Sequence, residues 1–157
     1  MIHNSFMVDI ELLKKLRNET SVSLADCRKA LEETKNDYKK ALEVLKKSGL
    51  EKAAKKSDRV VSQGLIESYI HQNGRVGVLV EVLCETDFVA RTDVFKQLIH
   101  EICMQVAAMN PKDVATLLKQ EYIRDGSRTM EILIKEAIAK LGENIVVKRL
   151  QRFEIGE

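Results

Sequence analysis

Few side chains in this sequence have the types and spacing that chemistry requires. Glu81 and Glu85 stand four positions apart, and acid–base catalysis by paired carboxylates would need both in one cleft. They fall on a predicted strand, where equal parity puts them on one side without bringing them together. His100 and Cys103 are three apart on a predicted helix, and a metal site or a nucleophilic pair would need a further partner. The sequence also lacks a phosphate-binding glycine loop and a Gly-x-Ser-x-Gly turn, so we expect no enzyme.

One corner of the chain has an unusual composition. The segment CETDFVARTD, residues 84–93, places Thr86, Asp87 and Phe88 between a predicted strand and a predicted helix. The chain has only four phenylalanines in 157 residues, so an aromatic ring beside an acid needs a reason here. Two interpretations stay open. Either Phe88 folds back into the core while Asp87 caps the next turn, or the ring stays outside and contacts another molecule.

Composition narrows the class of protein. The chain has 26 lysines and arginines against 24 acidic residues, a net charge of +2, which is not typical of a chain that neutralises a phosphate backbone. Cys27, Cys84 and Cys103 are odd in number and far apart, which favours reduced thiols in an intracellular protein. We expect no metal site, no cofactor and no membrane span, since no apolar run approaches the ~18 residues that a span requires. The first residues do not resemble a signal peptide, and Met7 is an alternative start.

The N-terminal part is predicted to form a three-helix module over residues 8–49. Asp9, Ser23 and Asp37 precede three segments with helical apolar spacing, and each can cap a helix N-terminus. Gly49 is predicted to end the third helix. Residues 50–62 are rich in lysine and arginine, and we interpret them as a basic helical linker, with a contact to an acidic partner or RNA as the alternative.

The remaining residues, 63–157, are predicted to form an α+β core domain. Asn73-Gly74 between two strand-like runs indicates a β-hairpin. In the last strand, the residues from Ile145 to Phe153 at odd positions are expected to share one side. Residues 112–128 are compatible with a short strand or a short helix. These elements predict a three-stranded antiparallel sheet packed with helices. The expected strands cover 65–70, 76–83 and 145–154, and the expected helices cover 92–109 and 129–140.

Five segments resemble the bacterial elongation factor Ts family. They are, in this order, LKKLRNETS, DCRKALEE, AAKKSDR, GRVGVLVEVLCETDFVAR and GENIVVKRLQRFEIGE. The resemblance runs from about Val8 to Glu157 with one gap, and it implies a three-helix module similar to ubiquitin-associated domains followed by an α+β core. It implies a guanine-nucleotide exchange factor that binds elongation factor Tu, in the cytoplasm of a bacterium or in an organelle.

The resemblance also assigns site residues. Thr86, Asp87, Phe88 and Val89 match the segment that enters the nucleotide-binding domain of elongation factor Tu near its magnesium site. There the phenylalanine acts as a wedge between helices, so that magnesium and phosphate coordination is disturbed and GDP leaves.

A docking surface on the first module is implied as well. Arg17, Leu24, Ala25 and Arg28 match positions that pack on a helix of the partner. The family usually has Thr-Gly-x-Gly-Met-Met-Asp-Cys-Lys where this chain has TSVSLADCR. The loss of both glycines predicts a loop that needs no positive φ.

Two further departures from the family pattern affect function. Gln105 stands where the family often has a histidine, and only 112–116 remain where the family has several dozen largely helical residues. Short members of the family can work as dimers, so a homodimer through the last strand is a further hypothesis.

Two other classes of protein stay open. One is a non-catalytic protein-binding module with a ubiquitin-associated-like domain, and the other is an RNA-binding translation accessory protein using residues 47–59, although we expect no direct nucleic acid partner.

Overall fold

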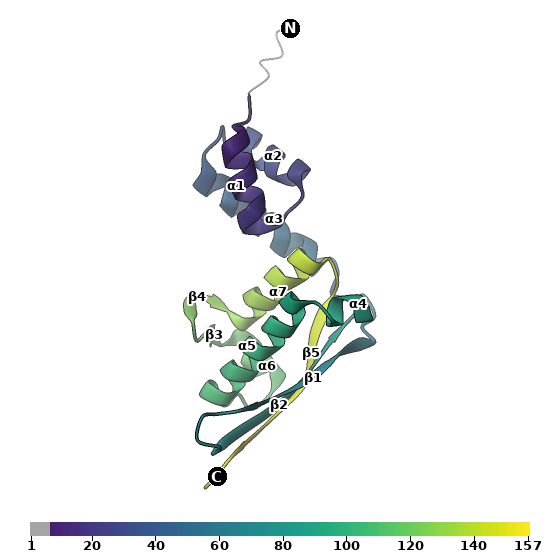
Figure 1. The fold of residues 1–157 in the computed structure, drawn as a ribbon, viewed down its shortest axis with the longest axis vertical. Helices are drawn as coiled ribbons and strands as arrows, with labels where there is room; N and C mark the ends of the chain where they lie inside the picture. The colour runs from purple at the N-terminus through teal and green to yellow at the C-terminus, as the bar shows by residue number, and fades with distance from the viewer. Residues whose placement is uncertain (1–6) are drawn as a thin grey trace. The chain divides into compact units, whose positions relative to one another are not determined.

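The computed structural model describes residues 7–157 and has two compact units, each described by itself below (Figure 1). The first unit ends at Lys52 and the second runs Ala53–Glu157. The choice of Met1 or Met7 as the start depends on residues 1–6, which lie outside the described residues. Within the described range no helix is both long and apolar enough to cross a membrane.

The first unit is the predicted three-helix module. Its helices are α1 (Ile10–Thr20), α2 (Leu24–Glu33) and α3 (Tyr38–Ala54). The predicted caps are in place, since Asp9 accepts from Glu11 N–H at 2.8 Å and Ser23 Oγ accepts from Asp26 N–H at 3.1 Å. Asp37 accepts from Lys40 N–H at 3.1 Å as α3 begins. The small core consists of Leu16, Cys27, Ala30, Leu31, Ala41 and Leu45.

The third helix is longer than predicted. It continues through Gly49 to Ala54, so the predicted stop at Gly49 is wrong. A glycine inside a helix costs about 1 kcal/mol relative to alanine, which lowers stability without ending the helix. Ala53 is 2% exposed and belongs to the core of the second unit, so burial favours the extra turns. After Ala54 the chain makes successive turns, so only the first part of residues 50–62 is helical.

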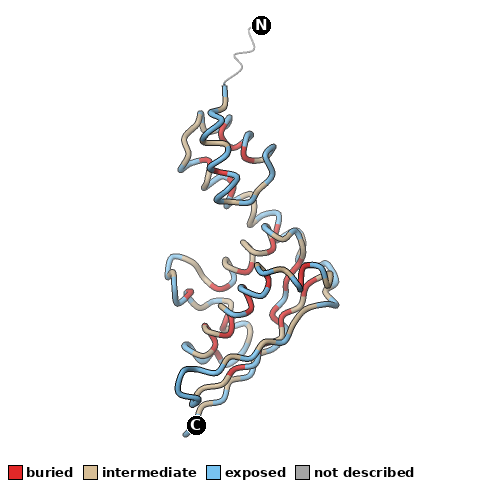
Figure 2. The backbone as a smooth tube through the Cα atoms, viewed as in Figure 1, coloured by how far each residue is buried: buried red, intermediate tan, exposed pale blue. Residues whose placement is uncertain are grey.

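The second unit is an α+β domain built on a three-stranded antiparallel sheet. The strands are β1 (Gln63–Ile70), β2 (Val76–Cys84) and β5 (Ile145–Glu154), in the order β1-β2-β5. The helices are α4 (Asp87–Ala90), α5 (Asp93–Met109), α6 (Val114–Lys119) and α7 (Met130–Leu141). Buried residues gather between α5, α7 and one face of the sheet (Figure 2). The predicted fold class is therefore confirmed.

The last strand contains an irregularity that the sequence pattern does not reveal. Pairing between β2 and β5 shifts register between Glu81 and Val82, which leaves Lys148 as an extra residue. Ile145 and Val147 are buried, whereas Phe153 is 65% exposed. The predicted strict alternation is thus wrong, because one extra residue reverses the side on which every later side chain lies. The uncovered side, here called the open face, carries the exposed apolar residues Ile66, Ile70, Leu79 and Phe153.

Residues 112–128 combine both structures that their sequence allows. Helix α6 is followed by a two-stranded hairpin, β3 (Glu121–Tyr122) and β4 (Asp125–Thr129). Gln105 of α5 fixes this hairpin: its Nε2 donates to Glu121 O at 3.0 Å, and its Oε1 accepts from Ile123 N–H at 2.9 Å. The Gln105 side chain is fully buried, so it supports the fold from inside and is not part of the surface.

Candidate functional site

The corner after β2 is held by two helix caps six residues apart. Thr86 is the N-cap of α4, and its Oγ1 accepts from Val89 N–H at 3.4 Å. Thr92 is the N-cap of α5, where its Oγ1 accepts from Phe95 N–H at 3.2 Å and donates to Val89 O at 2.8 Å. The two caps confine α4 to a single turn, because each marks the start of a separate helix. The backbone that carries Phe88 is therefore fixed on both sides.

Phe88 points away from the protein interior. Its side chain is 78% exposed, while Phe95, the next phenylalanine along the chain, is fully buried. The neighbours Val89 and Ala90 are 8% and 5% exposed and anchor the other side of α4 in the core. The alternative in which Phe88 is a core residue is thereby excluded. The Phe88 ring is therefore accessible from outside on a turn that is anchored in the core.

Asp87 lies in the same turn and does not cap it, because Thr86 has that role. Its carboxylate pairs with Arg91 Nη2 at 2.8 Å, with side chains 48% and 77% exposed. An ion pair as exposed as this contributes at most about 1 kcal/mol. The Asp87 carboxylate can therefore exchange Arg91 for a group on a partner at little energetic cost.

Sequence reasoning missed two residues at this corner, Glu143 and Asn144. Both donors of Thr86 reach the Glu143 carboxylate, its N–H at 3.0 Å and its Oγ1 at 2.6 Å. Asn144, which is 3% exposed, donates its N–H to Glu85 Oε1 at 2.7 Å. No local pattern could have revealed these bonds, since their partners are 57 and 59 positions apart.

The other candidate pairs do not form catalytic sites. Glu81 pairs with Arg149 on the open face, whereas Glu85 is bonded to Asn144 at the corner. The two carboxylates therefore have separate partners and do not form an acid–base pair.

The histidine and cysteine of α5 each bond to Glu67, the first to its side chain and the second to its backbone. His100 Nδ1 pairs with Glu67 at 2.8 Å, while the buried Cys103 Sγ donates to Glu67 O at 3.8 Å. Burial raises the pKa of Cys103 to about 12, and burial also raises the pKa of Cys84. These thiols remain protonated at neutral pH and are poor nucleophiles. Among the described residues no group of three potential metal ligands comes together.

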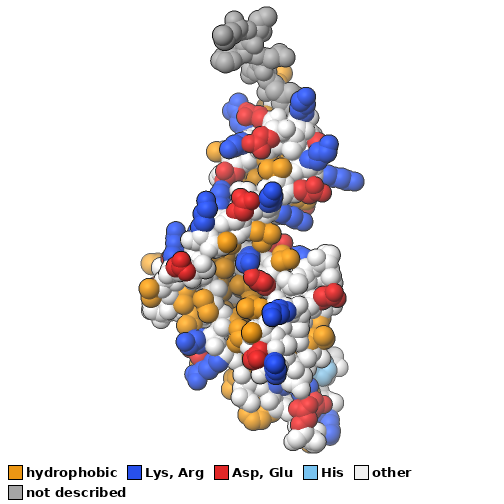
Figure 3. All heavy atoms as spheres, turned by 180° about the vertical axis from the view of Figure 1, so that it is seen from behind, with side chains coloured by type: hydrophobic (Ala, Val, Ile, Leu, Met, Phe, Trp, Pro, Cys, Tyr) orange, Lys and Arg blue, Asp and Glu red, His pale blue; other side chains and the backbone are white. Residues whose placement is uncertain are grey.

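A hollow of about 310 Å³ lies between α6, α7 and β5. The lining of the hollow is mainly aliphatic and includes Val114, Leu118, Ile134, Ile138, Ile145 and Val147. Apolar side chains also gather on the face of the second unit seen in Figure 3. The charged residues in the lining are Glu131 and Lys135, which pair with each other at 2.6 Å. The hollow therefore brings no pair of free acid and base groups together.

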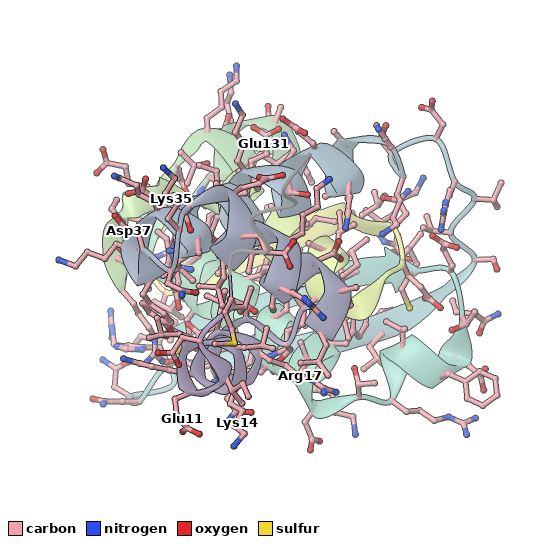
Figure 4. All side chains as sticks on the ribbon, turned by 90° about the horizontal axis from the view of Figure 1, so that it is seen from above. Glu11, Lys14, Arg17, Lys35, Asp37 and Glu131 are labelled. Atoms are coloured by element: carbon pink, nitrogen blue, oxygen red, sulfur yellow. The ribbon has the colours of Figure 1, made fainter. Side chains whose placement is uncertain are left out.

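The predicted docking residues of the first unit are all on its surface. Arg17 lies in the last turn of α1 and points outward (Figure 4), while Leu24, Ala25 and Arg28 lie in the first two turns of α2. Leu24 is 46% exposed.

The loop between α1 and α2 corrects one prediction. Ser21 has φ of 55° and donates its N–H to Arg17 O at 2.8 Å, so this loop does use a positive φ. The left-handed position is imposed by the end of α1, and serine occupies it at a cost that glycine would avoid.

Comparison with known proteins places the chain in a family. A family model described as Elongation factor TS matches residues 85–157. Elongation factor Ts of Thermoanaerobacter sp. (strain X514) is 42% identical over 196 positions, which cover 96% of each chain. The protein of that name from Coprothermobacter proteolyticus is 45% identical, over 96% of this chain and 99% of the relative. The chloroplastic elongation factor Ts of Guillardia theta is 41% identical, over 96% and 90%.

These alignments also show a shortening. The first runs over 196 positions, whereas this chain has 157 residues, so at least 39 positions of the relative have no counterpart here. With identities of 41–45% over nearly the whole of both chains, this chain belongs to the elongation factor Ts family of translation elongation factors.

Proposed function

We propose that this protein is a guanine-nucleotide exchange factor that binds elongation factor Tu·GDP and promotes GDP release by disturbing its magnesium and phosphate site. Membership of the family supports the partner. The observation that carries the mechanism is Phe88, 78% exposed on a turn whose last two residues, Val89 and Ala90, are buried in the core. The chain catalyses no chemical reaction in this scheme. It works in the bacterial cytoplasm, or in an organelle, as the name of the chloroplastic relative suggests.

The physical requirement for such a protein is differential affinity. An exchange factor must bind the nucleotide-free partner more tightly than the GDP-bound partner, and by linkage the factor by which it weakens GDP is the factor by which GDP weakens it. Insertion of Phe88 between two helices of the partner provides part of this difference. Magnesium is the vulnerable point, because its octahedral shell tolerates little displacement. Asp87, with only an exposed arginine to release, enters the same region.

The wider contact is assigned to the first unit. Arg17, Leu24, Ala25 and Arg28 provide the docking surface for a helix of the nucleotide-binding domain. Arg28 pairs with Glu32 at 2.9 Å in the free protein, and both side chains are exposed enough to rearrange. Compared with the Met-Met pair of the family, Leu24 and Ala25 offer a smaller and stiffer apolar contact.

Titration calorimetry tests the proposal directly. The protein is added to nucleotide-free elongation factor Tu and, separately, to the GDP-bound form. The proposal expects much tighter binding to the nucleotide-free form, by the same factor as the loss of GDP affinity in the complex. Equal affinity for the two forms contradicts exchange activity, even if the partner is correct.

A homodimer is a second part of the proposal. Strand β5 forms an edge of the sheet, and the open face presents Phe153 and Ile66, which are 65% and 63% exposed. A second copy that covers the open face would bury these side chains, and the dimer would offer two core domains to elongation factor Tu. Light scattering at working concentration tests it, and a monomeric mass removes this part of the proposal.

A further inference from the structure

The turn between α7 and β5 is hydrogen-bonded to the corner that carries Phe88. It begins at Gly142, which ends α7 with φ of 78° and turns the chain back toward β2. The next residue, Glu143, receives both the N–H and the hydroxyl of Thr86 in a bidentate arrangement, at 3.0 and 2.6 Å. The turn from α7 into β5 lies beside α4 in Figure 1.

Every polar group of Thr86 is used in this arrangement. Because its hydroxyl gives its proton to Glu143, the Oγ1 lone pairs are left to accept from Val89 N–H and so to cap α4. Its carbonyl accepts from the Cys84 thiol at 3.2 Å. Glu143 therefore fixes the orientation of the cap as well as the position of the backbone.

One more bond between the turn and the corner runs in the opposite direction. Glu85 accepts from Asn144 N–H at 2.7 Å, and the Asn144 side chain donates to Ser57 O at 3.2 Å and to Arg59 O at 2.9 Å. Glu85 and Thr86 at the corner are thus joined to Asn144 and Glu143 in the turn, and these two links resist rotation of the corner against the turn. Hydrogen bonds to carboxylates are stronger than neutral ones, so this set is suited to hold a short turn.

The ring itself has few contacts that hold it. A helix of one turn is not stable on its own, and Phe88 is 78% exposed, so its direction depends on the backbone of α4. Val89 and Ala90 fix α4 toward the core. Glu143 fixes its N-cap residue, Thr86, at the opposite end.

We propose that Glu143 is a positioning residue for nucleotide exchange, which holds Thr86 so that Phe88 is presented in one orientation to the nucleotide-binding partner. The inference rests on the proposed function, in which Phe88 is the inserted ring. It predicts that loss of Glu143 slows exchange within the bound complex more than it weakens docking, because the docking surface on the first unit is unchanged.

The first measurement uses the full-length free protein. The chain contains no tryptophan, so Phe88→Trp creates a single reporter at the site. Time-resolved anisotropy then measures the local motion of Trp at position 88 with and without Glu143→Ala. We expect the amplitude of fast motion to rise in Glu143→Ala and to return largely to the parent value in Glu143→Gln, because the amide can accept one bond and donate to the hydroxyl. Glu131→Gln, an exposed residue at the other end of α7 whose partner is Lys135, is the matched control and should change nothing.

The second measurement is GDP release from elongation factor Tu with Phe88 retained. Glu143→Ala should lower the rate at saturating protein about tenfold, with less than about a twofold change in the half-saturating concentration. Unchanged motion at position 88, or freed motion with an unchanged release rate, overturns the inference. If Glu143→Ala does not fold, Glu143→Asp, too short to serve both donors, takes its place with the same expectations. Failure of the proposed function is distinguishable, since it appears as no effect of Phe88→Ala on release and leaves the anisotropy result intact.

Discussion

The substitution Phe88→Ala tests the role of the exposed ring most sharply. Full burial of a phenylalanine side chain is worth about 1.5–3 kcal/mol. Since 78% of Phe88 is exposed in the free protein, its burial in a partner contributes about 1.2–2.3 kcal/mol of this. At 1.4 kcal/mol for each factor of ten, the accelerated release of fluorescent GDP from elongation factor Tu should fall about 7- to 50-fold. Stability should change by no more than about 0.5 kcal/mol, because the ring packs on little in the free protein.

Matched controls separate this effect from a general loss of apolar surface. Phe153→Ala removes another exposed ring of the second unit, and it should leave the release rate unchanged when light scattering shows the same oligomeric state. Phe88→Leu should retain part of the activity, because it keeps apolar bulk. The reasoning is refuted if Phe88→Ala exchanges GDP at the parent rate. It is also refuted if Phe88→Ala destabilises the protein by several kcal/mol, as truncation of a core residue does.

Three further substitutions test the account of the fold. The hydrogen bond with Lys52 is the largest cause, ahead of that with Ser23, that lowers the pKa of Asp26 from its ordinary value of 3.8. The Asp26 carboxylate therefore stabilises the native state above that pH, and this contribution is lost as the pH falls through the native pKa. Asp26→Asn should therefore destabilise α2 by about 0.2–1 kcal/mol at pH 7, measured by amide exchange, and the difference from the parent should vanish in acid. Gln105→Leu should lower the free energy of unfolding by about 1–3 kcal/mol in urea titrations, since it leaves buried backbone groups of the β3–β4 hairpin without partners; an unchanged midpoint contradicts this role. Ser21→Gly should raise the free energy of unfolding by about 0.5–1 kcal/mol, because glycine adopts positive φ without strain, and a loss of stability shows that the position is not strained.

The parts of the fold that depend on local chemistry could be predicted from the sequence. Asp9 and Ser23 cap the helices that their positions indicate, because a cap involves only the next three residues. Gly49 misled the prediction because a local preference of about 1 kcal/mol is smaller than what tertiary packing of the following turns can contribute. The bulge at Lys148 could not be seen either, since pairing with β2 decides where an extra residue is accommodated.

The candidate site shows the same division. The strand-to-helix corner and its short polar residues could be located from the sequence, but composition alone left the direction of Phe88 open. That direction depends on which neighbours are anchored, and the anchors come from the core and from Glu143, 57 positions away from Thr86. Long-range bonds of this kind have no signature in a single sequence.

The decisive experiment measures the release of fluorescent GDP from elongation factor Tu, with and without this protein, over a range of free magnesium concentrations. If the protein acts by disturbing magnesium coordination, it and magnesium oppose each other by linkage. Removal of magnesium should then speed release even without the protein, so at saturating protein the acceleration should be large where magnesium is bound and should shrink as magnesium is removed. A release rate that the protein leaves unchanged at every magnesium concentration contradicts the account.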